Sequence, residues 1–245
     1  MNCKIINLLG LMLLLATAHD GRAAGEAHFR DGVAAYESGR YDAAAQAFRA
    51  SLTEQPAAGT LLNLGLAEWR GGNPGAAMVA WEQAAWLNPF NADAQNNLSC
   101  AQQTIQIDPP ELTRCELIST WLPASCWTWI AGGSLWLAVA MVTLPGFFSW
   151  RKAGWHQSLA ALATGIFLLS IPPNFGVYTR AEIGIVTAKD TTLRLTPTRS
   201  AEPVASLPPG EPIRRLRTRG EYFFVHTQYG NGWVGRRQIQ FICPE

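Results

Sequence analysis

Apolar residues dominate the middle of the chain, and their pattern predicts a transmembrane helical hairpin over residues 126–179. Within residues 117–179 the only formally charged side chains are those of Arg151 and Lys152, which separate two apolar arms. A hydrocarbon core about 30 Å thick is spanned by about 20 helical residues, and each arm is long enough. A soluble helical hairpin, the alternative interpretation, would show a polar face on each helix, and neither arm does.

The two basic residues also predict the orientation of the hairpin. Short positively charged loops stay in the cytoplasm, so the turn at Arg151 and Lys152 is expected inside. Both segments that flank the hairpin are then extracytoplasmic. Pro172 and Pro173 lie within the second arm, and a proline pair there is expected to end or kink the helix.

A shorter apolar run follows Lys4 and predicts that residues 1–24 are a signal peptide. Cleavage after Ala18 fits the small residues that precede it, and Ala23 or Ala24 is an alternative site. An uncleaved anchor helix is the other interpretation. Both interpretations export the residues that follow, because Lys4 holds the N-terminus inside.

Residues 25–107 contain an internal repeat with a period of 33 residues. Glycines, a small residue, an aromatic residue and a proline recur in register: Gly32, Gly39, Ala44, Phe48 and Pro56 in the first copy, and Gly65, Gly72, Ala77, Trp81 and Pro89 in the second. We expect the first glycine of each copy to let two helices approach and the second to end the first helix. The alanine is expected at the helix crossing and the aromatic residue in the gap to the next helix pair. The proline is expected to stop the second helix.

These residues resemble the tetratricopeptide repeat over residues 25–91. The resemblance implies a stack of helix pairs with a groove that binds segments of other proteins. Asn63 and Arg70, on the first helix of the second repeat, are candidate groove contacts, and ordinary surface residues are the alternative. A further helix over residues 92–107 is expected to cap the stack, and residues 108–125 are expected to form a linker.

Short alternating strands and turns rich in Gly or Pro predict a small all-β module over residues 180–245. Strands are expected over residues 183–186, 192–197, 212–217 and 222–227, and from Trp233 onward. The Leu-Arg-Leu-Thr-Pro strand at 193–197, the aromatic strand at 222–225 and Gly-Trp-Val at 232–234 resemble the bacterial SH3-like domain. The resemblance implies a barrel that binds peptides or cell-wall glycans. Trp233 is expected in the barrel core, and a ligand contact is the alternative interpretation.

Charge and motifs narrow the function further. The repeat segment is acidic and the β module is basic, but neither has the charge of a nucleic-acid binder. The arginines of the β module suit an acidic partner, with a solvated basic face as the equal alternative. The five cysteines form no CxxC pair, and Cys100 and Cys115 either form a disulfide or are small buried thiols. The four histidines lie in different settings and no catalytic motif is present, so we expect no enzymatic activity, cofactor or metal.

The predicted fold is multidomain: a signal peptide, an all-α tetratricopeptide-like repeat module, a two-helix transmembrane hairpin and an all-β SH3-like barrel. This layout is similar to that of BatE-like membrane proteins of the aerotolerance operon. The resemblance implies partners with von Willebrand factor A domains and a link to oxygen or stress tolerance. We expect a multi-pass protein of the bacterial cytoplasmic membrane that acts as an extracytoplasmic scaffold for envelope proteins. A cell-wall tether or sensor acting through the SH3-like domain is the alternative.

Overall fold

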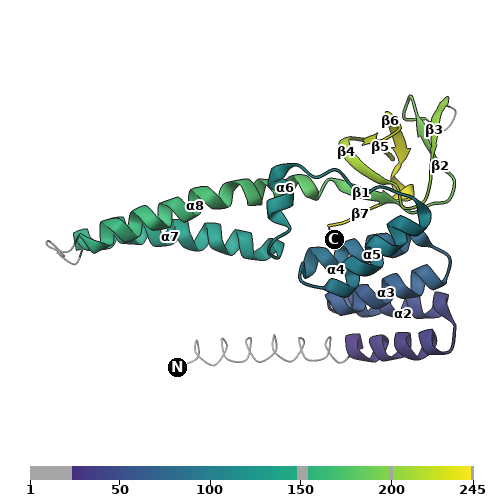
Figure 1. The fold of residues 1–245 in the computed structure, drawn as a ribbon, viewed down its shortest axis with the longest axis horizontal. Coiled ribbons are helices and arrows are strands. Elements are labelled where there is room, and N and C mark those ends of the chain that lie inside the picture. The colour runs from purple at the N-terminus through teal and green to yellow at the C-terminus, as the bar shows by residue number, and fades with distance from the viewer. Residues whose placement is uncertain (1–23, 148–153, 199–200, 244–245) are drawn as a thin grey trace, which may run out of the picture.

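The computed structural model describes residues 24–147, 154–198 and 201–243. Figure 1 shows a bundle of helices and a β-sheet lying together at one end, with a long helical hairpin projecting from them. The predicted signal peptide, apart from its last residue, and the basic turn at Arg151 and Lys152 fall outside the described residues.

The repeats form two helix pairs and one further helix. The helices are residues 24–37, α2 Tyr41–Glu54, α3 Ala58–Arg70, α4 Pro74–Leu87 and α5 Ala92–Ile105. Gly39 and Gly72 follow the first helix of each pair with φ of 74° and 79°, a left-handed backbone that favours glycine. Ala44 and Ala77 are fully buried, as expected for positions at a helix crossing.

Close approach of the paired helices depends on two glycines. A Cβ added to Gly32 would lie 2.7 Å from the ring of Phe48, and one added to Gly65 would lie 2.3 Å from Nε1 of Trp81. Non-bonded heavy atoms pack at about 3.5–4.0 Å, so a side chain does not fit at either position. The two aromatic rings therefore occupy the space over the glycine of their own pair. Each ring also belongs to a core cluster that reaches the next helix, with Leu61 and Leu64 for Phe48 and with Ala101 for Trp81, so the predicted gap to the next pair is one part of its surroundings.

The sequence predicted a plain linker between the repeats and the hairpin, but this segment has structure of its own. It contains the short helix α6, Arg114–Ser119, which packs against the end of the hairpin. Thr113 and Glu116 form a capping box at its start, in which each side chain binds the backbone N–H of the other. Such reciprocal bonds satisfy N–H groups that a helix start leaves open.

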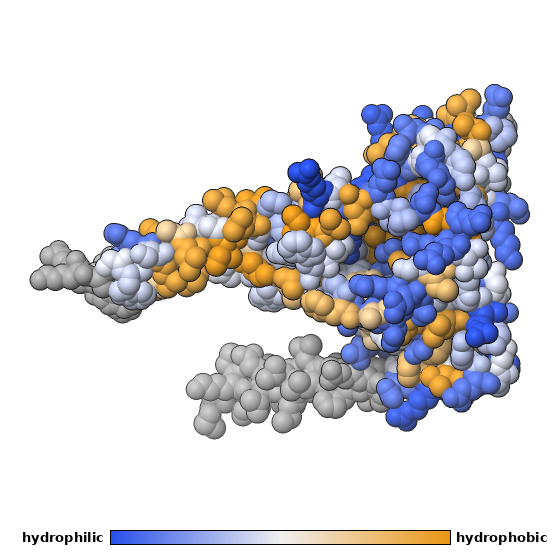
Figure 2. All heavy atoms as spheres, in the orientation of Figure 1, coloured by the Kyte–Doolittle hydropathy of each residue, from blue (hydrophilic) through white to orange (hydrophobic). Residues whose placement is uncertain are grey.

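The hairpin consists of α7, Ala124–Phe147, and α8, Trp155–Arg180. Both helices are long and apolar enough to cross a membrane. Only 11% of the apolar stretch of α7 and 28% of that of α8 are buried, whereas the core helix of a soluble protein is mostly buried. Figure 2 shows the resulting apolar surface along the hairpin, in contrast to the largely polar surface of the repeats and sheet.

Helix α8 continues through Pro172 and Pro173 to Arg180, so the prolines do not end it. Tertiary contacts hold the turn that follows. The side chain of Asn174 donates hydrogen bonds to the carbonyl of Ser170 in the same helix, at 2.8 Å, and to that of Trp127 in α7, at 3.1 Å. Neighbouring polar groups can replace backbone bonds that prolines remove from a helix.

The β module is a seven-stranded antiparallel sheet in the order β3-β2-β6-β5-β4-β1-β7. Its strands are β1 Ile183–Val186, β2 Thr191–Arg194, β3 Pro203–Leu207, β4 Pro212–Arg219, β5 Tyr222–Thr227, β6 Gly230–Gly235 and β7 Ile239–Phe241. Within the described residues β3 and β7 are the two edges, and the sheet is not closed. Sequence reasoning missed β3, whose mostly exposed residues lack apolar alternation.

Trp233 does not lie in the core, contrary to expectation. It is half-buried on the face of β6 opposite the fully buried Val234, because successive side chains of a strand point to opposite faces. Its ring lies beside that of Phe224, with the ring centres 5.2 Å apart. Strand β6 also begins at Gly230, three residues before its expected start at Trp233.

Candidate functional site

The repeats and the sheet share one hydrophobic core. Its buried side chains come from both modules: Ala77, Met78, Val79, Trp81, Trp86 and Ala101 from the repeats, and Ile183, Ile185 and Ile242 from the sheet side. A Cβ on Gly75 would lie 2.4 Å from the carbonyl oxygen of Val186, so α4 approaches β1 as closely as a glycine allows. Burying one large apolar side chain contributes about 1.5–3 kcal/mol. The two modules are therefore packed as one body.

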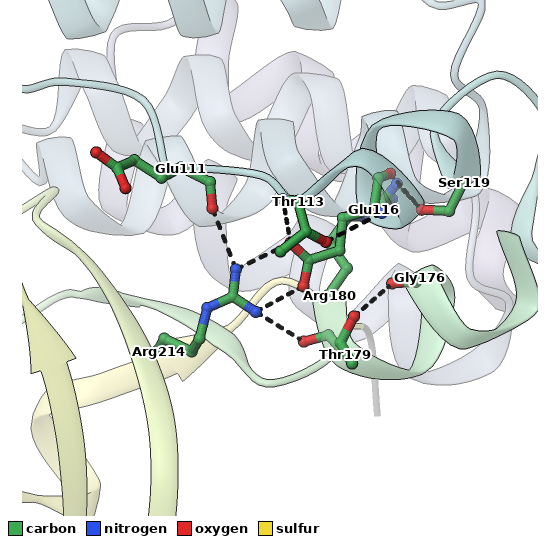
Figure 3. Close-up of polar contacts among 8 residues, drawn as sticks. All are labelled: Glu111, Thr113, Glu116, Ser119, Gly176, Thr179, Arg180 and Arg214. Carbon is green, nitrogen blue, oxygen red and sulfur yellow. Dashed lines mark hydrogen bonds and ion pairs between the residues drawn. The ribbon is translucent and has the colours of Figure 1, made fainter. Parts of the chain in front are cut away.

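Glu116 connects α6 to the sheet through a two-point ion pair (Figure 3). Its carboxylate binds Arg214 of β4, with Nη1–Oε1 at 2.6 Å and Nη2–Oε2 at 3.0 Å. The same guanidinium donates to the backbone carbonyls of Glu111 and Thr179. Burial opposes ionisation of Glu116, but the bonds from Arg214, Thr113 and Thr179 and the charge of Arg214 outweigh it and lower its pKa to about 2.

Arg180 connects the end of the hairpin to the repeats. Its guanidinium carbon lies 4.3 Å from the ring centre of Trp86 in α4, a cation–π contact. Its Nη1 donates to Oγ of Ser119 in α6 at 3.3 Å. Burial raises the pKa of Glu82, also in α4, and the charge of Arg180 partly offsets that effect. We call Glu116, Ser119, Arg180 and Arg214 the junction, since they join repeats, hairpin and sheet.

A second shared feature is a cavity of about 650 Å³ between the repeats and the edge of the sheet. We call it the repeat–sheet groove. Its walls come from the repeats (Leu52, Thr53, Pro56, Leu61, Gln83) and from the sheet and C-terminal residues (Arg215, Phe223, Arg236, Ile239, Gln240, Phe241, Cys243). Among the residues that the structure describes, the walls include two arginines and no acidic residue. Nε2 of Gln83 donates across the groove to the carbonyl of Phe241 at 2.9 Å.

A third feature is a cavity of about 520 Å³ beside the junction, lined by residues 108–113 and by the sheet. Glu211 is buried there and accepts a hydrogen bond from Gln228 at 3.0 Å. Burial raises the pKa of Glu211, the bond from Gln228 lowers it and the charge of Asp108 raises it further. No group of three His, Cys, Asp or Glu residues suited to a metal ion occurs in the part of the chain that the structure describes.

The predicted contact residues lie away from these features. Asn63 is half-buried and Arg70 is exposed on α3, and neither lines the repeat–sheet groove or the cavity beside the junction. Cys100 is exposed and Cys115 is half-buried, and both are free thiols. Of the two alternatives left open by the sequence, the disulfide is therefore not formed, and Cys100 is not a buried thiol either.

The residues that do join the modules were not singled out from the sequence as contacts. Glu116 lies three residues after Thr113, a capping-box spacing that sequence reasoning can detect. Its partner Arg214 lies 98 residues further along the chain, and no local pattern selects it among the neighbouring arginines of β4. Gly75 lies at the start of a helix, and no sequence pattern around it predicted its contact with β1.

The repeat residues match a known family. Residues 13–59 and 32–92 match the tetratricopeptide repeat. Together the two matches cover about a third of the chain. No curated protein matches the chain. The two helix pairs, each with a glycine at its closest approach, agree with this match. This part of the chain consists of tetratricopeptide repeats, which are modules of protein–protein interaction.

Proposed function

We propose that this chain is a membrane-anchored scaffold that binds other envelope proteins on the extracytoplasmic side of a bacterial cytoplasmic membrane. The observation that carries the proposal is the attachment of an interaction module to an exposed apolar hairpin. Both ends of the hairpin meet the body of repeats and sheet (Figure 1): α6 precedes the start of α7, and Arg180 and β1 lie at the end of α8. Repeats and sheet then lie on one side of the membrane.

Exposed aromatic residues support the membrane position of the hairpin. Trp155 and Tyr178 are exposed near opposite ends of α8 and lie about 35 Å apart at about 1.5 Å per helical residue. A hydrocarbon core is about 30 Å thick, and Trp and Tyr favour its two interfaces. Trp129, near the start of α7, is 80% exposed and marks the same interface as Tyr178.

The finer parts of the proposal rest on the resemblances in the sequence. We take the sheet to be a divergent SH3-like module and the layout to be that of BatE-like proteins, which suggests partners with von Willebrand factor A domains. The proposal includes no catalysis and no cofactor. The junction supports this role because Glu116 is paired with Arg214 and Arg180 contacts Ser119 and Trp86, contacts that tie the body to its anchor at several points.

Two experiments test the scaffold. A periplasm-active reporter fused after Glu245 should be active and one inserted at Ala153 should be silent, and the reverse pattern would overturn the orientation. A photo-crosslinking residue at Arg70, on the exposed surface of α3, should capture membrane proteins of the same envelope. The same probe at Leu195, exposed directly after β2 and far from the repeats in sequence, is the matched control. Equal capture of partners at Leu195 would contradict a contact through the repeats.

A second function, binding of cell-wall glycan, is favoured by one observation. Trp233 and Phe224 form a half-buried aromatic pair on the outer face of the sheet, and aromatic faces are suited to contact sugar rings. If this function operates, the intact chain in detergent should sediment with purified cell-wall sacculi and Trp233→Ala should abolish sedimentation. Sedimentation that does not depend on Trp233 would exclude the pair as the glycan site.

A further inference from the structure

We propose that the repeat–sheet groove binds an extended, acidic segment of a partner protein. The inference rests on the scaffold function and names the chemistry of the segment that the scaffold recognises. It starts from the position of β7, the edge strand of the sheet that forms one wall of the groove.

The backbone of β7 presents hydrogen-bonding groups to the groove. On either side of β7, Gln238 accepts from the N–H of Thr187 at 2.9 Å and Ile242 donates to the carbonyl of Ile183 at 3.2 Å. Gln240 lies between them, opposite Ile185 of β1, so residues 238, 240 and 242 form the alternate set that bonds the segment containing β1. By the alternation of an antiparallel ladder, Ile239 and Phe241 direct their backbone groups away from β1. The carbonyl of Phe241 is taken by Gln83. The carbonyl of Ile239 and the N–H of Phe241 then face the groove, an acceptor and a donor two residues apart, as an extended peptide requires.

The charges of the groove select an acidic peptide. Arg215 lies with its guanidinium carbon 4.4 Å from the ring centre of Phe241 and is paired with Glu182. Arg236 lies 5.7 Å from the ring centre of Phe223 and is exposed. No ion pair among the described residues includes Arg236. An exposed guanidinium beside an aromatic ring provides a charge-assisted donor for a carboxylate.

The apolar walls and the size of the groove suit alternate side chains of such a segment. Leu52 and Leu61 from the repeats face the ring of Phe241 from the sheet across a cavity of about 650 Å³, within the usual range of ligand sites. The site exists only because the repeats and the sheet are packed together. A partner bound here contacts both modules at once, and binding it strengthens their association.

Fluorescence anisotropy with the full chain in detergent micelles tests the inference. The probe is a labelled octapeptide of alternating Glu and Val, and the control peptide replaces Glu with Lys. Loss of one hydrogen bond to a charged group weakens binding by about tenfold or more, which is the effect expected for Arg236→Gln. Thr53→Glu, on the repeat wall, should weaken binding similarly because it adds a like charge. The matched control Arg237→Gln, exposed and outside the groove, should stay within about twofold.

The outcomes separate the inference from the scaffold function. Equal binding of both peptides, or equal effects of Arg236→Gln and Arg237→Gln, would overturn the groove as an acidic-peptide site. If crosslinking at Arg70 still recovers envelope proteins in that case, the scaffold stands without this site. If the probe binds in a manner that depends on Arg236 and Thr53 but no partner protein is recovered, the groove stands and the scaffold function fails.

Discussion

The ion pair between Glu116 and Arg214 should contribute more to the stability of the chain than an exposed pair, and the two partners should not be equivalent. The side chain of Glu116 is 0% exposed and that of Arg214 is 27% exposed. Arg214→Met leaves a buried carboxylate without its partner, whereas Glu116→Gln leaves an arginine that water can still reach. We therefore expect Arg214→Met to be the more damaging substitution.

The magnitude follows from the pKa of Glu116. A decrease from 4.5 to about 2 in the folded chain corresponds to about 3 kcal/mol of stabilisation. Breaking a buried pair by removing one partner costs about 3–5 kcal/mol, which sets the loss for Arg214→Met. Glu116→Gln keeps a neutral acceptor for Thr113 and should cost about 1.5–3 kcal/mol. The double variant should cost less than the sum, because the unpaired buried charge is removed.

The stabilisation should also depend on pH. The folded pKa of Glu116 lies below its ordinary value, so the contribution is complete above about pH 4.5 and is lost as the pH falls toward 2. The assay is urea unfolding of the full chain in non-denaturing detergent, followed by near-ultraviolet circular dichroism at pH 7 and at pH 3. The difference between wild type and Glu116→Gln should shrink at the lower pH.

An exposed pair provides the control. Glu26 and Arg30 are 57% and 76% exposed one helical turn apart, and Glu26→Gln should cost no more than about 0.5 kcal/mol. The reasoning would be refuted if Arg214→Met cost no more than Glu26→Gln. It would also be refuted if the losses of Glu116→Gln and Arg214→Met were additive in the double variant.

Other substitutions test the packing of the repeats and the sheet. Gly65→Ala should lower the free energy of unfolding by about 1–3 kcal/mol through overpacking against Trp81, while Gly59→Ala, where a Cβ meets nothing within 4 Å, should be neutral or stabilising in the same urea titration. Gly75→Ala forces a Cβ against the rigid backbone of Val186; hydrogen exchange should then speed up in both α4 and β1, and faster exchange in α4 alone would contradict a shared core. Met78→Ala, at a side chain 2% exposed, should cost about 2–5 kcal/mol and lower the unfolding midpoints of helices and sheet together, whereas separate midpoints would show two independent bodies.

Local patterns in the sequence were sufficient to predict the repeats and the hairpin. The period of 33 residues identifies where helices pair, because Gly32 and Gly65 each face an aromatic residue of the same repeat. Composition alone identifies an apolar stretch that is long enough to span a lipid bilayer. Strand periodicity located β1 and β5 at their observed bounds. It did not detect β3, a mostly exposed edge strand whose only fully buried residue is Leu207.

Tertiary structure decided how these parts meet. Glu116 and Arg214 are distant in the chain, and only the packing of α6 between the hairpin and the sheet turns a local helix cap into an ion pair between modules. The same holds for the repeat–sheet groove, whose walls come from the repeats on one side and from β4, β5, β7 and neighbouring residues of the sheet module on the other. Periodicity reports which face of an element is buried, but not what buries it. The partner that covers α4 is chosen by shape, since Gly75 admits the backbone of β1 where any larger side chain would keep it away.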